Sequence, residues 1–252
     1  MKILLNMLTH GNEVLGLDVA REISKLGLTK DVLTIQRANE KAYQLRKRYI
    51  DQDLNRSFPG KKNGNHEEQI AYRLSPIVKS ADVVIDIHST TSTLKDALIV
   101  TKLNQKTLQC IQAMQPKYVL VMNATKKSAL ISQAKVGIGF EYGRNNEKST
   151  LNKVVADMKR LFNFLQVTST PLPRKKTPTT YFTVVATVPK PPGYKLLAHV
   201  DNYKLIQKGE VFAQKGKKYI RASEDFYPLL FRQRAYIGYF GFMGIQKDPK
   251  KK

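Results

Sequence analysis

Residues 2–13 read KILLNMLTHGNE and combine an expected strand with a candidate metal-binding pair. The apolar run 2–8 predicts a short buried strand, because it is brief and ends at a turn that contains Gly11. His10 and Glu13 follow this strand three residues apart, so both side chains can face one point. A His-x-x-Glu pair is weak evidence by itself, since it often occurs by chance. The rest of the sequence has to distinguish a metal site from an ordinary turn.

Strand-like and helix-like segments alternate through the first two thirds of the chain. Further strands are predicted at 31–38, 81–88, 96–101, 117–122 and 135–143, and helices at 13–27, from Asn65 onward, at 103–115 and at 149–166. Asn65 followed by Glu68 is a capping-box pattern for the second helix. The alternation predicts an α/β domain with a mixed sheet flanked by helices. Residues 39–64 read as a long polar connection, which in a compact domain is usually functional.

The sequence pattern changes after residue 167. Residues 168–180 are rich in Pro, Thr and charge, which predicts a linker. Short strand-like runs separated by Gly, Pro and charged turns then predict a small all-β C-terminal domain over 181–247. Residues 248–252 form a basic tail. The α/β domain is therefore expected to span 1–167.

The charge balance limits the kinds of partner. The 252 residues contain 43 Lys and Arg against 20 Asp and Glu, a formal net charge of +23, and residues 171–252 hold 17 of the basic and 5 of the acidic residues. A field of this sign attracts anions, which include acidic small molecules, anionic polymers and nucleic acid. Solvated lysines of a generally basic protein are an equally weighted explanation.

The single cysteine, Cys110, excludes an internal disulfide and predicts a reducing compartment. No stretch approaches the roughly 18 apolar residues that a membrane span needs. The opening ILLNML is too short for a signal peptide, and cleavage behind it would remove or expose His10. We therefore expect a cytoplasmic protein that has no membrane partner.

Four polar clusters are expected at strand ends or in the long connection, and they read THGNE (9–13), RYIDQDLNRSF (48–58), DIHSTT (86–91) and GFEYG (139–143). Ligands of α/β sheets bind outside the carboxyl ends of the strands, so parallel strands would bring all four together. His88 could then join His10 and Glu13 in a three-ligand zinc set with one position open for water. Asp86 shares a strand face with His88 and could orient its imidazole, although a surface carboxylate is the alternative.

Glu141 and three side chains of the long connection are candidates for catalysis and substrate binding. A carboxylate among Gly and apolar residues is costly unless it is paired or functional, which suits Glu141 to general-base chemistry. An ion pair with Arg144 or with the 48–56 segment is the alternative. Arg48, Asn55 and Arg56 could support an oxyanion and hold a substrate carboxylate, or could belong to a solvated basic loop.

Two further histidines lack company typical of a metal site. His66 lies at a helix start beside two glutamates and is expected to be solvated. His199 lies in a predicted strand of the C-terminal domain and is expected to be structural.

In this order, THGNE, the R-Y-I-D-x-D-L-N-R-x-F stretch, D-x-H-x-T-T and the later Gly-x-Glu strand resemble the aspartoacylase and succinylglutamate desuccinylase family, which has the zinc carboxypeptidase-like fold. The resemblance covers nearly the whole chain, including the small C-terminal β-domain. It implies one zinc per chain, bound by His10, Glu13 and His88. It also suggests a homodimer.

The resemblance also implies roles for the remaining candidates. Arg48 would polarise the scissile carbonyl, and Asn55 and Arg56 would hold a substrate carboxylate. Glu141 would act as base and then as acid. Family members place a Tyr from the C-terminal domain near the substrate, and the stretch FYPLLFRQRAY points to Tyr236 for this role.

One position departs from the family pattern. Aspartoacylases of the animal type carry a substrate-binding Arg about ten residues before the catalytic Glu, where this chain has Ile131. Lys126, Lys127 or Lys135 could compensate, although no motif places them. The departure puts N-acetylaspartate in doubt as the substrate and leaves amide hydrolysis unaffected.

The sequence therefore predicts a zinc-dependent amidohydrolase that acts on a small N-acyl amino acid or a related carboxylate-bearing amide. Its basic surface would attract such an anionic substrate. One alternative is a zinc carboxypeptidase that trims peptides. Another is a basic protein that binds nucleic acid or a different polyanion, which ranks well below because no nucleic-acid motif with interleaved aromatic residues is present.

Overall fold

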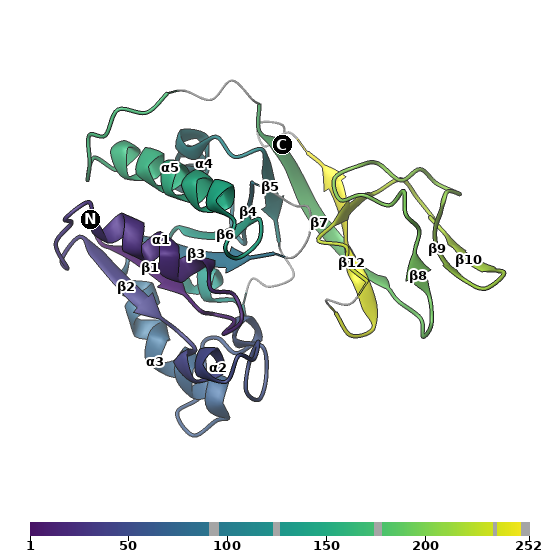
Figure 1. Cartoon of the computed structure of the whole chain (residues 1–252), viewed down its shortest axis with the longest axis horizontal. Coiled ribbons are helices and arrows are strands. Elements are labelled where there is room, and N and C mark those ends of the chain that lie inside the picture. The colour runs from purple at the N-terminus through teal and green to yellow at the C-terminus, as the bar shows by residue number, and fades with distance from the viewer. Residues whose placement is uncertain (91–95, 123–126, 174–177, 234–235, 248–252) are drawn as a thin grey trace. The chain divides into compact units, whose positions relative to one another are not determined.

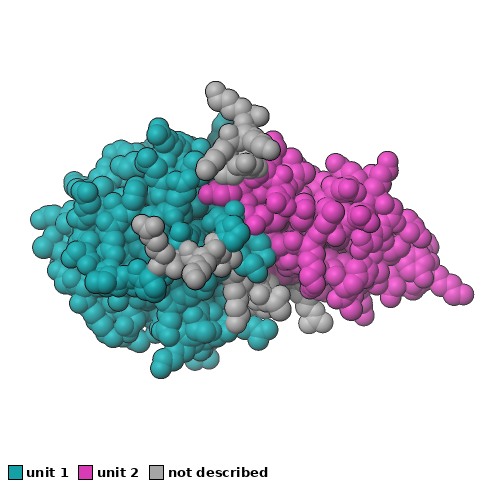
Figure 2. Space-filling model, turned by 90° about the horizontal axis from the view of Figure 1, so that it is seen from above, with its two compact units in different colours: residues 1–179 teal, residues 180–252 magenta. Residues whose placement is uncertain are grey.

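A computed structural model describes residues 1–90, 96–122, 127–173, 178–233 and 236–247. The chain divides into two compact units, Met1–Thr179 and Thr180–Lys252, which Figure 2 shows in different colours. The division falls within the Pro- and Thr-rich segment that the sequence marks as a linker. In the described ranges, no helix combines the length and the apolar character that crossing a membrane requires.

The first unit is built on a mixed sheet (Figure 1). Its strands are β1 (Ile3–Met7), β2 (Leu33–Arg37), β3 (Val83–Ser89), β4 (Ala97–Val100), β5 (Tyr118–Val121) and β6 (Gly137–Tyr142). Within this unit their order is β5-β4-β6-β3-β1-β2. Strand β1 is parallel to β2 and β3, and β3 is parallel to β6, whereas β4 is antiparallel to β6. The predicted mixed α/β fold is confirmed.

Helices cover both faces of this sheet (Figure 1). One side carries α1 (Leu15–Ser24), α4 (Gln105–Met114) and α5 (Lys148–Phe164), and the other carries α3 (His66–Ser80). The 3₁₀ turns η1 (Leu54–Arg56) and η3 (Leu130–Gln133) share an apolar core with α3. Leu4 and Val84 belong to the apolar core on the α3 side. Side chains two residues apart on a strand share a face, so Asn6, Asp86 and His88 also lie on this side.

The start of α3 follows the sequence prediction. Asn65 Oδ1 accepts the backbone N–H of Glu68 at 3.0 Å, and the Glu68 carboxylate accepts the backbone N–H of Asn65 at 3.0 Å. The predicted capping box is therefore confirmed.

The long polar connection predicted at 39–64 contains regular structure that the sequence analysis did not predict. It contains helix α2 (Glu40–Gln44) and the turn η1, each preceded by a polar residue whose side chain accepts a backbone N–H. These elements are too short to show apolar periodicity, so no helical pattern identifies them in the sequence.

The second unit is all-β, as the sequence predicts. Its strands are β7 (Thr180–Pro189), β8 (Lys195–Leu196), β9 (Val211–Lys215), β10 (Lys218–Arg221), β11 (Tyr227–Leu229) and β12 (Tyr239–Gln246). Strand β12 pairs with β7 and β11, and β9 pairs with β8 and β10, all antiparallel. Phe212, Phe226 and Phe240 pack in its core. The strand position expected for His199 is wrong, because this residue lies in a turn with its side chain 52% exposed.

A buried polar network joins β6 to α5 in the first unit. The Tyr142 hydroxyl donates to Asp157 Oδ2 at 2.8 Å, and Arg160 Nη1 donates to Asp157 Oδ1 at 2.8 Å. Burial raises the pKa of Tyr142 well above its usual value, and the neighbouring charges of Asp157 and Asp96 raise it further. This hydroxyl therefore stays protonated wherever the chain is folded near neutral pH.

Replacing Tyr142 by Phe is expected to lower the free energy of unfolding by about 1.5–3 kcal/mol at neutral pH, because a hydrogen bond to a buried carboxylate is lost. The native pKa is raised, so the hydroxyl stabilises the fold fully below the unfolded tyrosine pKa of about 10 and progressively less above it. Urea unfolding of both proteins at neutral pH and above about pH 10 measures this difference. An advantage of the wild type that is as large at the higher pH would contradict the assignment.

Candidate active site

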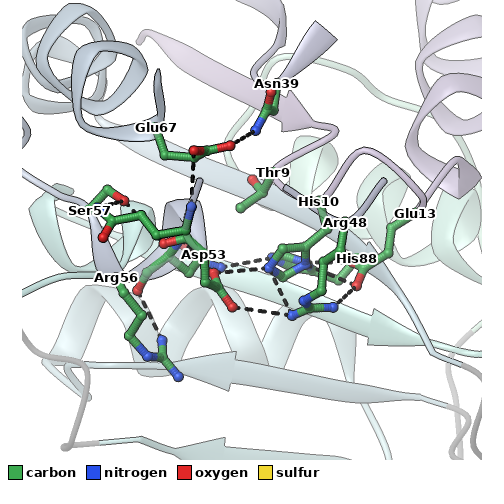
Figure 3. A network of polar contacts seen from close by, with 12 residues as sticks. Thr9, His10, Glu13, Asn39, Arg48, Asp53, Arg56, Ser57, Glu67 and His88 are labelled. Atoms are coloured by element: carbon green, nitrogen blue, oxygen red, sulfur yellow. Dashed lines mark hydrogen bonds and ion pairs between the residues drawn. The ribbon is translucent and has the colours of Figure 1, made fainter. Parts of the chain in front are cut away.

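His10, Glu13 and His88 converge at the carboxyl ends of β1 and β3 (Figure 3). One ligand atom from each lies within 4.8 Å of the other two. His10 Nδ1 is 2.9 Å from Glu13 Oε1, and His88 Nδ1 is 2.8 Å from Glu13 Oε2. Both rings are buried, and their centroids are 5.0 Å apart. The predicted grouping of these three side chains is therefore present in the structure.

The turn that carries His10 and Glu13 is held by close backbone packing. Gly11 lies between them, and an added Cβ at this position would overlap the backbone of Ala42 and Tyr43 in α2. The Gly11 N–H donates to the Arg48 carbonyl oxygen at 2.9 Å. Glycine is required here because α2 and the 48–56 segment approach the turn directly.

The outer nitrogen of each imidazole faces a carboxylate. His88 Nε2 is 2.8 Å from Asp86 Oδ2, while Asp86 Oδ1 accepts from Asn6 Nδ2 and Thr9 Oγ1 at 2.8 Å each. His10 Nε2 is 3.1 Å from Asp53 Oδ1. Outer acceptors of this kind fix the ring and its tautomer, which leaves the inner nitrogen for a metal.

Asp53 was not singled out from the sequence. Its position in the D-L-N-R stretch, two residues before Asn55, is the feature that could have identified it. In the structure it also accepts the backbone N–H of Asn55 at 2.9 Å. The predicted contact between Asp86 and His88 is present, and Asp53 gives His10 an equivalent partner.

Opposite charges shift the pKa values of these groups. Burial lowers the pKa of His88, but Asp86 and Glu13 outweigh it and raise the pKa well above its usual value. Burial also lowers the pKa of His10, but Glu13 and Asp53 outweigh burial and raise this pKa above its usual value. Burial raises the pKa of Glu13, but His10 and His88 lower it well below its usual value. A divalent cation bound by neutral rings would replace the charge of two ring protons, so the donor set fits zinc in both ligand type and charge.

Arg48 lies over the same group with its side chain 41% exposed. Its Nη1 donates to Glu13 Oε1 at 2.9 Å, and its Nη2 lies 3.4 Å from Asp53 Oδ2 and 2.9 Å from His10 Nε2. A guanidinium only donates, whereas the His10–Asp53 contact needs a proton on Nε2. The carboxylates are therefore the partners of Arg48 that are compatible with metal binding at Nδ1.

Asn55 and Arg56 extend this site along η1. Asn55 Oδ1 accepts the backbone N–H of Leu130 at 3.1 Å, which fixes the amide, and Asn55 Nδ2 lies 3.5 Å from His88 Nε2. Arg56 is exposed and donates to the Asn55 carbonyl oxygen at 2.9 Å. The Asn55 amide thus lies next to the His–Glu–His group, whereas the Arg56 guanidinium points away from it (Figure 3).

Glu141 lies on β6 directly opposite His88 in the parallel pairing with β3. Paired positions share a face of the sheet, so Glu141 lies on the same face as His88. Glu141 is half-buried. The sequence expectation of a carboxylate embedded in apolar surroundings is therefore met only in part.

Two other sequence expectations have different outcomes. Tyr236 belongs to the second unit, where its ring stacks on Tyr239 with centroids 4.5 Å apart, and its contact with substrate stays a prediction. Ile131 is buried in the core on the α3 side. Lys135 pairs with Asp82 at the start of β3, whereas the candidate site lies at the carboxyl end of this strand, so Lys135 does not replace the arginine of the family pattern. Lys126 lies outside the described residues.

Residues 2–167 match the family model described as the succinylglutamate desuccinylase/aspartoacylase catalytic domain. The chain belongs to this family. The predicted family is therefore confirmed. The match covers the unit that contains the His–Glu–His group and all of the candidate residues except Tyr236.

Individual relatives agree with this assignment. An N-acyl-aromatic-L-amino acid amidohydrolase (carboxylate-forming) of Xenopus laevis is 28% identical over 183 residues, which span 62% of this chain and 59% of that protein. An aspartoacylase of Danio rerio is 30% identical over 183 residues, which span 61% of this chain and 57% of that protein. The chain thus matches less than two thirds of the length of these relatives.

The fold is shared with solved structures of the same group. The crystal structure of murine aminoacylase 3 is similar with a TM-score of 0.82 at 18% identity, over 98% of this chain and 95% of that one. Succinylglutamate desuccinylase from Vibrio parahaemolyticus gives a TM-score of 0.72 at 17% identity, over 98% of this chain and 82% of that one. At these identities the similarity establishes the fold.

If the His–Glu–His group is a zinc site, purified protein should contain close to one zinc per chain, and His88→Ala should lose most of it. Removing one of three protein ligands leaves too few donors for a stable site. Metal analysis after dialysis measures the content. His199→Ala is the matched control, because this exposed histidine lies in the second unit. Full zinc occupancy in the His88→Ala protein would show that the ligand assignment is wrong.

Proposed function

We propose that this protein is a zinc-dependent amidohydrolase that cleaves the amide bond of a small N-acyl amino acid or a related carboxylate-bearing amide. The observation that carries the proposal is the convergence of His10, Glu13 and His88 beside Arg48, with Glu141 on the neighbouring strand. Family membership supports the reaction class, and the amidohydrolase and aspartoacylase named above are relatives of this kind.

The metal would be held by His10, Glu13 and His88, with Asp53 and Asp86 orienting the two rings. Zinc at such a site acts as a Lewis acid and makes water a nucleophile near neutral pH. Two His and one Glu leave a position open, which is the pattern of catalytic zinc sites.

The side chains of this chain would perform the proton transfers and hold the substrate. Glu141 would take a proton from the attacking water and give it to the leaving nitrogen, so that the amide separates into a carboxylic acid and an amine. Arg48 would donate to the carbonyl oxygen as it gains negative charge. Asn55 and Arg56 would bind the carboxylate of the substrate, for which a guanidinium is well suited.

The function is tested with a panel of N-acetyl, N-succinyl and N-formyl amino acids that includes acidic and aromatic members. Release of the free amine by zinc-loaded protein, and its loss on treatment with a chelator, would support the proposal. Zinc-loaded, folded protein that releases no amine from any member of the panel would count against it. A cytoplasmic location, a homodimeric state and the lack of a nucleic-acid partner remain predictions from the sequence.

Glu141→Gln is expected to lower turnover by about 10²–10⁴-fold while zinc content and melting temperature stay near those of the wild type, because the amide keeps the size of the side chain but cannot accept the proton. Tyr142→Phe is the matched control, since it is the next residue on the same strand and faces α5. The control should be less stable but equally active per folded molecule. A Glu141→Gln protein that is unstable yet fully active when folded would assign this carboxylate a structural role.

A further inference from the structure

Glu67, in the first turn of α3, is a fully buried carboxylate that lies outside the His–Glu–His group. Its Oε1 accepts the backbone N–H of Ile50 at 2.7 Å and Asn39 Nδ2 at 2.8 Å. Its Oε2 accepts the backbone N–H groups of Asp51 at 2.9 Å and Gln52 at 3.2 Å. These four donors are uncharged groups, and only an ionised carboxylate can accept from all of them.

Burial raises the pKa of Glu67, but the backbone donors and Asn39 outweigh it and lower the pKa below its usual value. The carboxylate is therefore ionised, and within the described part of the chain it is held by these four hydrogen bonds. A buried charge of this kind is costly to keep, and here its partners are segments of chain rather than a single counter-ion.

The three backbone donors lie between two residues of the active site. Arg48 is two residues before Ile50, and Asp53 directly follows Gln52. Residues 45–53 form no helix or strand, and the backbone N–H groups of 50–52 bond to the Glu67 carboxylate. Asp51 returns the contact, because its Oδ2 accepts the backbone N–H of His66 at the start of α3. The segment that carries Arg48 and Asp53 is thus tied to α3 from both directions. Figure 3 shows Glu67 and Asn39 in this connection.

Asn39 extends the connection to the turn that holds the metal-ligand pair. Its Nδ2 donates to Glu67, while its Oδ1 accepts the N–H of Ala42 at 3.2 Å and so caps α2. Helix α2 packs so closely on Gly11 that a Cβ there would overlap Ala42. His66 is partly buried and its Nε2 lies 3.2 Å from Asn39 Oδ1, so the expectation that His66 is solvated is met only in part.

A role limited to helix capping does not account for these contacts. An acidic residue in the first turn stabilises a helix through its dipole, and this would apply equally to Glu67 and Glu68. Glu68 is the residue that completes the capping box with Asn65. Every hydrogen bond of the Glu67 carboxylate described above goes to a segment outside α3.

We propose that Glu67 is a positioning residue for the active site, which holds the 48–53 segment and α2 so that Arg48 and Asp53 reach Glu13 and His10. This inference rests on the proposed function, since it assigns Glu67 a part in the chemistry of that same site. Arg48 depends on it for its place over Glu13, and Asp53 depends on it for its contact with His10.

The test compares Glu67→Gln with Glu68→Gln, the same chemical change one residue apart on the same helix turn. In Glu67→Gln the amide nitrogen replaces an acceptor and faces N–H donors, so the 50–52 segment should be released. Hydrogen exchange of the amides of 50–52 should become at least about tenfold faster. Zinc affinity should fall by about 10–100-fold, because Asp53 no longer orients His10. Displacement of Arg48 should lower kcat, and with it kcat/KM by about 10²-fold.

Glu68→Gln should lose its ion pair with Lys61 and some thermal stability, while exchange at 50–52, zinc affinity and kcat stay near the wild-type values. A purely structural role for Glu67 would lower the melting temperature of Glu67→Gln and leave zinc affinity and kcat per folded molecule unchanged, which would overturn the proposal. If Glu67→Gln does not fold, Glu67→Asp keeps the charge and shortens the reach by one methylene. Glu67→Asp should change hydrogen exchange at 50–52, zinc affinity and kcat in the same direction as Glu67→Gln, but less. Zinc affinity and exchange at 50–52 that are unchanged in Glu67→Asp would also overturn the proposal.

Failure of the proposed function is distinguishable from failure of this inference. Wild-type protein without turnover on any N-acyl amino acid would reject the function. Exchange at 50–52 and zinc affinity need no substrate, so they decide on their own whether Glu67 positions the site.

Discussion

The parallel register of β1, β3 and β6 is the constraint on which the site depends. Asn6 lies opposite Asp86, and His88 lies opposite Glu141. Side chains alternate between the faces of a strand, so this register places all four on the α3 side, while Met7 and Ile87 lie beside Gly16 of α1 on the other. A slip of one residue would exchange the two sets and bury the polar groups against α1. The apolar residues of both faces therefore hold the polar residues in register.

Charge balance is the second requirement of this arrangement. Glu13, Asp53 and Asp86 lie within reach of two imidazoles, and three carboxylates so close together need cationic partners. Arg48 supplies one such partner from a segment that has no regular structure of its own. The charge balance at the strand ends therefore includes a residue of a loop, and that loop is bonded to α3 through Glu67.

The 3₁₀ turn η3 packs between the core on the α3 side and strand β6. Leu130 and Ile131 are buried in the core, and Asn55 holds the backbone of Leu130. An added Cβ at Gly137 would overlap the Ile131 carbonyl oxygen, so η3 packs directly on β6. A residue so enclosed cannot be exchanged for a long cation without repacking.

The sequence by itself determined the alternation of strands and helices and the capping box of α3, because each depends on neighbours a few residues away. It also placed Asp86 on the same strand face as His88, and the structure decided that the two are in contact. It also identified His10, Glu13 and His88 through strand ends that a mixed sheet brings to one edge. Only the tertiary structure decided that Asp53 faces His10 and that Glu67 binds the 50–52 segment. These contacts join segments that have no periodic pattern of apolar residues. The sequence also does not distinguish a buried carboxylate from a solvated one. Which glutamate of the pair at 67 and 68 is buried depends on how the whole loop folds over α3, and local sequence does not contain that information.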